Sequence, residues 1–106
     1  MADAALSVRV VSPAEVVFEG EAASVVAPAW DGKVGILPGH APFLALLGAG
    51  ELAVDIPGGG SRTFYVAGGV LKVEGQAVTV LTEYAGEGPP DEIPAAALIH
   101  PEDVTA

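Results

Sequence analysis

Two histidines, His40 and His100, are the residues of this chain best suited to bind a metal or to act as a general base. A zinc site needs three or four ligands close together, drawn from cysteine, histidine and carboxylate. The chain has no cysteine, His100 lies far away near the C-terminus, and the carboxylate nearest to His40 is Asp31. A metal site is therefore disfavoured. We expect the His40 ring, between Gly39 and Pro42, either to close a surface loop by hydrogen bonding or to contact a partner.

The run from Gly58 to Ser61 has the composition of a phosphate-binding loop but lacks its pattern. A P-loop needs a lysine followed by serine or threonine after the last glycine, at the start of a helix, whereas Arg62 and a strand-like sequence follow here. Ser61 also fails as a hydrolase nucleophile, because the Gly-x-Ser-x-Gly pattern would require glycine at the position of Thr63. The sequence predicts the tip of a hairpin.

Carboxylates are the commonest charged groups, and a pair of them in a pocket could carry acid–base catalysis. The chain has 14 Asp and Glu against 4 Lys and Arg. Several fall at predicted turns or at outward positions of predicted strands: Glu15, Glu19, Glu21, Glu51, Asp55 and Glu74. Because such positions are solvated, the sequence predicts no catalytic residue, no metal site and no cofactor.

Trp30 is the sole tryptophan and directly precedes a predicted turn. A tryptophan in this position either fills the rim of a core or anchors an interface, as aromatic residues often do. We expect the first of these, a core side chain.

The formal net charge of −10 disfavours nucleic acids and anionic membrane surfaces as partners. A basic or neutral protein partner suits this charge, although acidic turns also serve simply to keep a small β domain soluble and monomeric. No apolar run approaches the ~20 residues of a membrane-spanning helix, and the N-terminus lacks the pattern of a signal or transit peptide. We therefore expect no direct insertion into lipid.

Apolar residues recur at every second position along most of the chain, which is the period of half-buried β-strands. Turn-forming residues interrupt this alternation at positions 12–14, 19–21, 57–61, 68–69 and 74–76. The sequence predicts an all-β, antiparallel, ten-stranded β-sandwich of two packed sheets, since one open sheet would leave an apolar face in water.

We expect one β-sandwich domain over residues 1–86, followed by a different kind of segment. After Gly86 the alternation stops, and prolines at positions 89, 90, 94 and 101 prevent a long helix. Residues 87–106 are therefore predicted to be a short, irregular, Pro-rich tail.

The segment from Asp31 to Phe43 resembles the signature loop of the epsilon subunit of F-type ATP synthases. That loop has the pattern Gly-x-hydrophobic-Gly-hydrophobic-x-Pro-Gly-His-Ala-Pro, and every fixed position is matched between Gly32 and Pro42. Residues 64–73 and 78–82 are similar to two further blocks of the family, in the same order and spacing. The resemblance extends over about residues 5–86.

The resemblance implies a non-catalytic rotor subunit in the central stalk of a bacterial proton-translocating ATP synthase, at the cytoplasmic face of the inner membrane. Such a subunit binds the γ subunit and the ring of c subunits, couples rotation of the ring to ATP synthesis, and needs neither a cofactor nor a second copy of itself. Members of the family usually continue into two helices that can inhibit ATP hydrolysis. This chain ends before such a hairpin, so we expect no helix-mediated inhibition.

Positions of contact follow from the same resemblance. Contacts with the c-ring are expected at Asp31, Gly32, Lys33, Val34 and His40. Contacts with γ are expected at Ser12, His40, Ala41, Pro42 and Ala45. Lys33 occupies a position where many relatives have an acidic residue, which argues against simple charge pairing with the ring.

Two other functions stay open from the residues alone. One is a stand-alone β-sandwich that binds proteins without belonging to the synthase, which would leave γ unbound. The other is a small sugar- or metal-dependent enzyme, which would need a pocket that the sequence does not indicate.

Overall fold

The computed structural model describes residues 5–88, and these form strands and turns without any helix. Eight strands follow one another along this part of the chain. Their bounds are β1 Leu6–Val11, β2 Val16–Ala22, β3 Ser24–Ala29, β4 Gly32–Ile36, β5 Phe43–Leu46, β6 Ala49–Asp55, β7 Ser61–Glu74 and β8 Ala77–Gly86.

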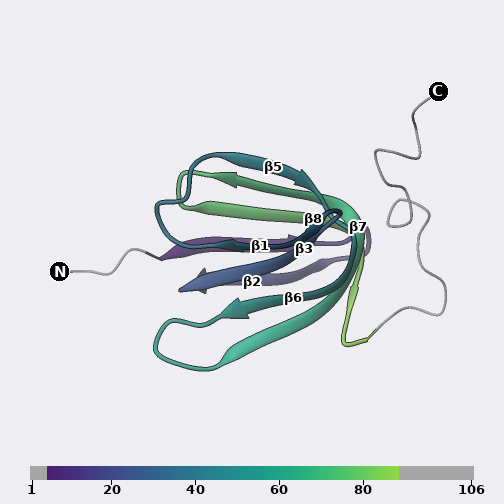
Figure 1. Cartoon of the computed structure of the whole chain (residues 1–106). Coiled ribbons are helices and arrows are strands. Elements are labelled where there is room, and N and C mark those ends of the chain that lie inside the picture. The colour runs from purple at the N-terminus through teal and green to yellow at the C-terminus, as the bar shows by residue number, and fades with distance from the viewer. Residues whose placement is uncertain (1–4, 89–106) are drawn as a thin grey trace.

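All eight strands belong to one hydrogen-bonded sheet that folds over on itself (Figure 1). The order is β2-β1-β8-β7-β6-β3-β4, and β5 pairs with β7 beside this path. Neighbouring strands are antiparallel except for β1 and β8, which run parallel from the pair Ser7 and Ala77 to the pair Val11 and Leu81. The N-terminal hairpin is thus joined to the last strand.

The sheet bends where three neighbouring strands bend together: residues 43–55, β7 and β8. Strands β5 and β6 both pair with β7 in a single register, from Phe43 opposite Val73 to Asp55 opposite Ser61. The pairing continues between them, because the Leu47 N–H donates to the Gly69 carbonyl at 2.9 Å and the Gly68 N–H to the Gly48 carbonyl at 3.0 Å. Residues 43–55 therefore act as one bent strand against a bent β7.

Gly68, Gly69 and Thr82 make this corner. Both glycines have positive φ, 74° and 115°, and a Cβ at Gly69 would overlap the carbonyl oxygen of Leu81 and lie 2.7 Å from the Cα of Thr82. The buried Thr82 hydroxyl lies within donating distance of the Gly68 carbonyl at 2.7 Å and the Tyr84 carbonyl at 2.8 Å. It also accepts a hydrogen bond from the Tyr84 N–H at 3.3 Å. The Thr82 side chain therefore provides hydrogen-bond partners for backbone groups that the bend buries.

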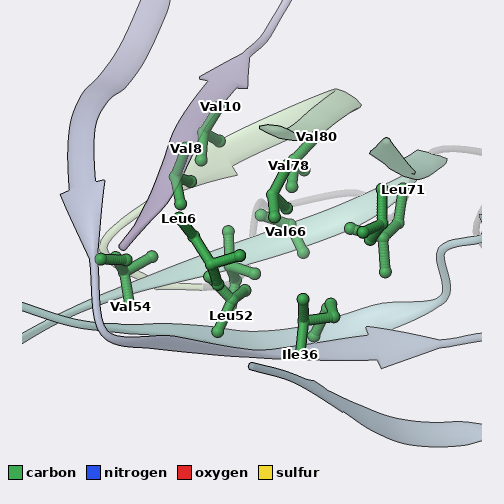
Figure 2. Close-up of a cluster of buried hydrophobic side chains, with 14 of the residues drawn as sticks. Leu6, Val8, Val10, Ile36, Leu52, Val54, Val66, Leu71, Val78 and Val80 are labelled. Carbon is green, nitrogen blue, oxygen red and sulfur yellow. The ribbon is translucent and has the colours of Figure 1, made fainter. Parts of the chain in front are cut away.

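The two arms of the folded sheet enclose one hydrophobic core (Figure 2). Leu6, Val8 and Val10 alternate along β1 with exposed or partly exposed residues, which confirms the period of two read from the sequence. They meet side chains of the other arm, including Ile36 and Leu52, all fully buried. Burying such side chains supplies the main stabilisation, at about 25 cal/mol per Å² of apolar surface.

The structure differs from the predicted strands at two glycine-containing segments. Residues 19–21 lie inside β2 and Gly68-Gly69 lies inside β7, so neither is a turn. Glycine permits a bend without ending the pairing, and this is why residues 5–88 form eight strands in one folded sheet where ten strands in two sheets were predicted. The predicted hairpin tip is confirmed, with the Ile56 N–H bonded to the Gly60 carbonyl at 3.0 Å. Of the predicted tail, residues 89–106 lie outside the described part.

Loops gather at two opposite ends of the folded sheet. One end holds the bend of the sheet and the β1–β2 and β3–β4 turns, and we call it the corner end. There, Ala29 pairs with Leu47, and the Trp30 N–H donates to the Leu46 carbonyl at 3.0 Å. We call the other the turn end, which holds the β6–β7 and β7–β8 turns, residues 37–42 and the start of β1.

We expect alanine to destabilise the fold more at Gly69, in the corner, than at Gly59, in the hairpin tip, although both glycines have positive φ. Gly59, in the hairpin tip, has φ 130° and open space where a Cβ would lie, so Gly59→Ala should lower the free energy of unfolding by about 1–3 kcal/mol, from backbone strain alone. Gly69→Ala adds a collision with backbone and should cost more than about 4 kcal/mol. Urea unfolding of both variants measures this, and equal losses would show that the close approach at Gly69 is unimportant.

Candidate partner-binding surfaces

His40 belongs to the loop between β4 and β5 and lies at the turn end. Its Nδ1 is 2.7 Å from the carbonyl oxygen of Ala41, and its ring meets the Phe43 ring edge-on with centroids 5.7 Å apart. The expectation that the ring closes its own loop is therefore confirmed. Among residues 5–88, no group of three or more histidine, aspartate or glutamate residues is placed to hold a metal ion.

Gln76 ties this loop to the β7–β8 turn. Its side-chain Oε1 accepts from the Gly39 N–H at 2.9 Å, and its backbone carbonyl accepts from the Ser7 N–H at 2.7 Å. Its Nε2 donates to the Ala5 carbonyl at 3.4 Å. One residue thereby holds the signature loop, the β7–β8 turn and the start of β1 at the turn end.

Asp31, Gly32 and Lys33 are exposed and lie in and beside the β3–β4 turn at the corner end, and Val34 follows in β4. His40 follows β4 at its other end. The strand from Gly32 to Ile36 separates the two by roughly 13 Å at about 3.3 Å per residue. The structure therefore keeps the first four predicted c-ring residues together and places His40 apart from them.

The predicted γ residues are divided in the same way. Ser12 forms the β1–β2 turn at the corner end, where its N–H donates to the Glu15 carbonyl at 2.9 Å. His40, Ala41 and Pro42 lie at the turn end. Ala45 pairs with the buried Leu71, lies on the same face of the sheet and is half-buried.

The sequence did not indicate a row of apolar side chains on the outer face, three of them exposed and two partly exposed. Leu46, Val70, Leu81, Val11 and Val16 are successive cross-strand neighbours on β5, β7, β8, β1 and β2. We call them the outer row. Exposed fractions are 50% for Leu46, 52% for Leu81 and 45% for Val16. Only the strand pairing reveals the row, because its members are scattered through the sequence.

Trp30 lies at the rim of the corner and not in the core cluster. It is half-buried, and its backbone N–H is bonded to Leu46, the first member of the outer row. Trp30 thus lies at the rim of the core, one of the two placements considered from the sequence, and it is not among the fully buried side chains. Trp30 directly follows β3 and precedes β4, so it lies where these two strands turn at the corner end.

The geometry gives no support for acid–base catalysis in the described part of the chain. The six carboxylates considered from the sequence are all exposed, as predicted. An open hollow of about 350 Å³ beside β5 has Glu74 as the one carboxylate among its lining residues. A second hollow, of about 320 Å³ at the corner, likewise has one carboxylate in its lining, Glu83. Among residues 5–88 there is also no helix long and apolar enough to cross a membrane.

The bonds of Gln76 predict a local change in amide exchange. Gln76→Ala removes the acceptor of the Gly39 N–H but keeps the backbone carbonyl that accepts from Ser7. We expect exchange at Gly39 to accelerate at least about tenfold, because local opening costs less when a bond is lost. Ser7 serves as the internal control. Hydrogen exchange followed by NMR measures both, and an unchanged Gly39 rate would contradict the role of this side chain.

Comparison with known proteins places these features in a family. Residues 5–88 match the model of the ATP synthase delta/epsilon chain β-sandwich domain. The chain is 43% identical over 82 residues to the ATP synthase epsilon chain of Psychrobacter cryohalolentis, covering 77% of this chain and 59% of that relative. It is 45% identical over 80 residues to that of Alkalilimnicola ehrlichii, covering 76% and 57%.

Two solved structures share the fold. A chain of the mitochondrial ATP synthase of Euglena gracilis superposes with a TM-score of 0.73 at 24% identity, covering 78% of this chain and 53% of that one. A chain from the central stalk and c-ring of the Tetrahymena thermophila enzyme gives a TM-score of 0.66 at 15% identity, covering 77% and 66%. The chain spans about three-fifths of the length of these curated relatives. With its folded sheet matched over the whole described part, the chain belongs to the ATP synthase delta/epsilon family through its β-sandwich domain.

Proposed function

We propose that this chain is a non-catalytic rotor subunit of a proton-translocating F-type ATP synthase, binding the γ subunit and the c-ring in the central stalk. The match of the family model to residues 5–88 carries this proposal. Through such an assembly the chain would lie at the cytoplasmic face of the bacterial inner membrane, without inserting into lipid itself.

The folded sheet suits the transmission of torque between two partners. Three strands continue through the bend without losing their pairing, so the arms cannot slide past each other without breaking backbone hydrogen bonds. Exposed turns at both ends leave room for a partner at each. Coupling rotation to synthesis requires this stiffness. The six carboxylates considered from the sequence are exposed, and neither hollow among residues 5–88 holds a pair of carboxylates, which fits a non-catalytic subunit.

Inhibition of ATP hydrolysis is not a property that we assign to the described sandwich. In the family resemblance that inhibition belongs to a pair of helices, and residues 5–88 contain strands and turns alone. The sandwich of residues 5–88 is therefore expected to join a γ-containing complex without itself inhibiting hydrolysis strongly.

Co-expression with γ from the same genome tests the rotor role. Size-exclusion chromatography is expected to show the two proteins co-eluting in equal amounts, and hydrolysis assays of the complex then test the absence of inhibition. Separate elution of two folded proteins would favour the alternative function, a stand-alone β-sandwich that binds other proteins.

Charge reversal at the corner end tests the c-ring contact. Asp31→Lys, alone or together with Glu51→Lys, should weaken association with the isolated c-ring several-fold at low salt, and the loss should shrink at high salt because exposed charges are screened. Glu21→Lys makes the same change of charge on an exposed residue beside the turn end and is the matched control. Equal behaviour of Asp31→Lys and Glu21→Lys at all salt concentrations would argue against a specific contact at the corner end.

A further inference from the structure

The signature loop contains a tight turn at Leu37-Pro38-Gly39-His40, which we call the signature turn. The His40 N–H donates to the Leu37 carbonyl at 3.1 Å, the bond from fourth to first residue that is typical of a β-turn. Gly39 has φ 88°, and the ring of Pro38 fixes its own φ near about −65°. Among the common turn types only type II combines these two values, so the peptide between Pro38 and Gly39 has a defined orientation.

A type I turn is the alternative form for the same four residues. It keeps the bond between residues 37 and 40 but rotates the peptide between Pro38 and Gly39 by about half a revolution. That rotation reverses the directions of the Gly39 N–H and the Pro38 carbonyl. Because glycine has no Cβ, Gly39 can adopt the φ of either form. Sterically, the signature turn can therefore exist in two forms.

Gln76 favours one of these forms from outside the turn. The Gly39 N–H, which the turn's own bond does not use, donates to Gln76 Oε1 at 2.9 Å. In the type I form the same N–H would point away from Gln76, and this bond would be lost. The β7–β8 turn in turn fixes the backbone of Gln76: Gly75 has φ 61° and Gln76 does not have positive φ, which is the pattern of a two-residue type II′ hairpin turn. A tight hairpin thus supports a side chain that stabilises one peptide orientation in another loop.

We propose that Gln76 is a positioning residue for the binding of γ, because it holds the signature turn in the type II form that γ recognises. This inference rests on the proposed function. Three of the positions expected to contact γ directly follow the peptide that Gln76 holds: His40, which is half-buried, and Ala41 and Pro42, which are exposed. Gln76 acts on these residues through Gly39 and does not itself have to touch the partner.

Two substitutions at Gln76 separate its side-chain bonds. Gln76→Ala removes the acceptor of the Gly39 N–H and should weaken binding of purified γ about three- to tenfold, by lowering the fraction of chains in the competent form. Gln76→Glu keeps an acceptor for Gly39 but loses the amide that donates to the Ala5 carbonyl. At high salt, where its added charge is screened, it should bind γ within about twofold of the unmodified chain. Equal losses for both variants would assign the effect to the start of β1 and overturn the inference.

Gly39→Ala tests the form of the turn directly. A Cβ at Gly39 would meet open space, so alanine adds backbone strain at φ 88° without a collision and favours the type I form. Gly58→Ala is the matched control, because Gly58 has φ 89° and open space as well but lies in the β6–β7 turn. Gly39→Ala should weaken γ binding more than about tenfold, and Gly58→Ala less than about twofold. Equal affinities of these two variants would show that γ does not depend on the form of the signature turn.

NMR measures the form of the turn independently of binding. The Gly39 amide hydrogen lies close to the Pro38 Hα in a type II turn and farther from it in a type I turn, so the NOE between them distinguishes the two. This NOE should weaken in Gln76→Ala and Gly39→Ala and persist in Gln76→Glu and Gly58→Ala. A general loss of stability would instead lower the Tm and leave the NOE unchanged. An unchanged NOE in Gln76→Ala would contradict the positioning role.

Failure of this inference is distinguishable from failure of the proposed function. If the unmodified chain does not bind γ, the rotor role itself is wrong. If it binds γ and Gln76→Ala binds equally well, the rotor role stands and Gln76 is not a positioning residue. If Gln76→Ala loses affinity for the isolated c-ring alone, the turn serves the ring and its assignment to γ is overturned.

Discussion

The close approach of two backbones at the corner is the constraint on which the rest of the structure depends. Gly69 lies so near Leu81 and Thr82 that no side chain fits between them, and this contact lets β7 and β8 bend together while staying paired. Because the pairing survives the bend, the two arms face each other and can share one core. The buried Thr82 hydroxyl completes the corner, where its single hydrogen lies within donating distance of the Gly68 and Tyr84 carbonyl oxygens.

Much of this fold could be predicted from local pattern. The alternation in β1, the hairpin tip before Ser61 and the turn at Gly75 each follow from the period of apolar residues and from turn chemistry. The bend could not be read in the same way, because a glycine pair looks the same in sequence whether it ends a strand or bends one. Which of these it does depends on Leu81 and Thr82, which approach it only in the folded chain.

The candidate surfaces show the same division between local and non-local information. The segment containing His40 was recognisable as a block, and its ring does close its own loop. Its distance from Asp31 and Ser12 depends on the course of β4 and β1, which the sequence leaves open. The outer row is wholly non-local, since each of its members comes from a different strand.

The parallel pairing of β1 with β8 has a consequence for how the chain reaches its native state. The first described hairpin, β1 and β2, can form as soon as it is synthesised, but the strand that covers the other edge of β1 is the last of the eight strands described in residues 5–88. Until then Leu6, Val8 and Val10 have only part of their packing partners, and the open edge of β1 can pair with other chains. Productive folding must therefore wait for residues far apart in sequence to meet, which places this small domain among the slower folders of its size.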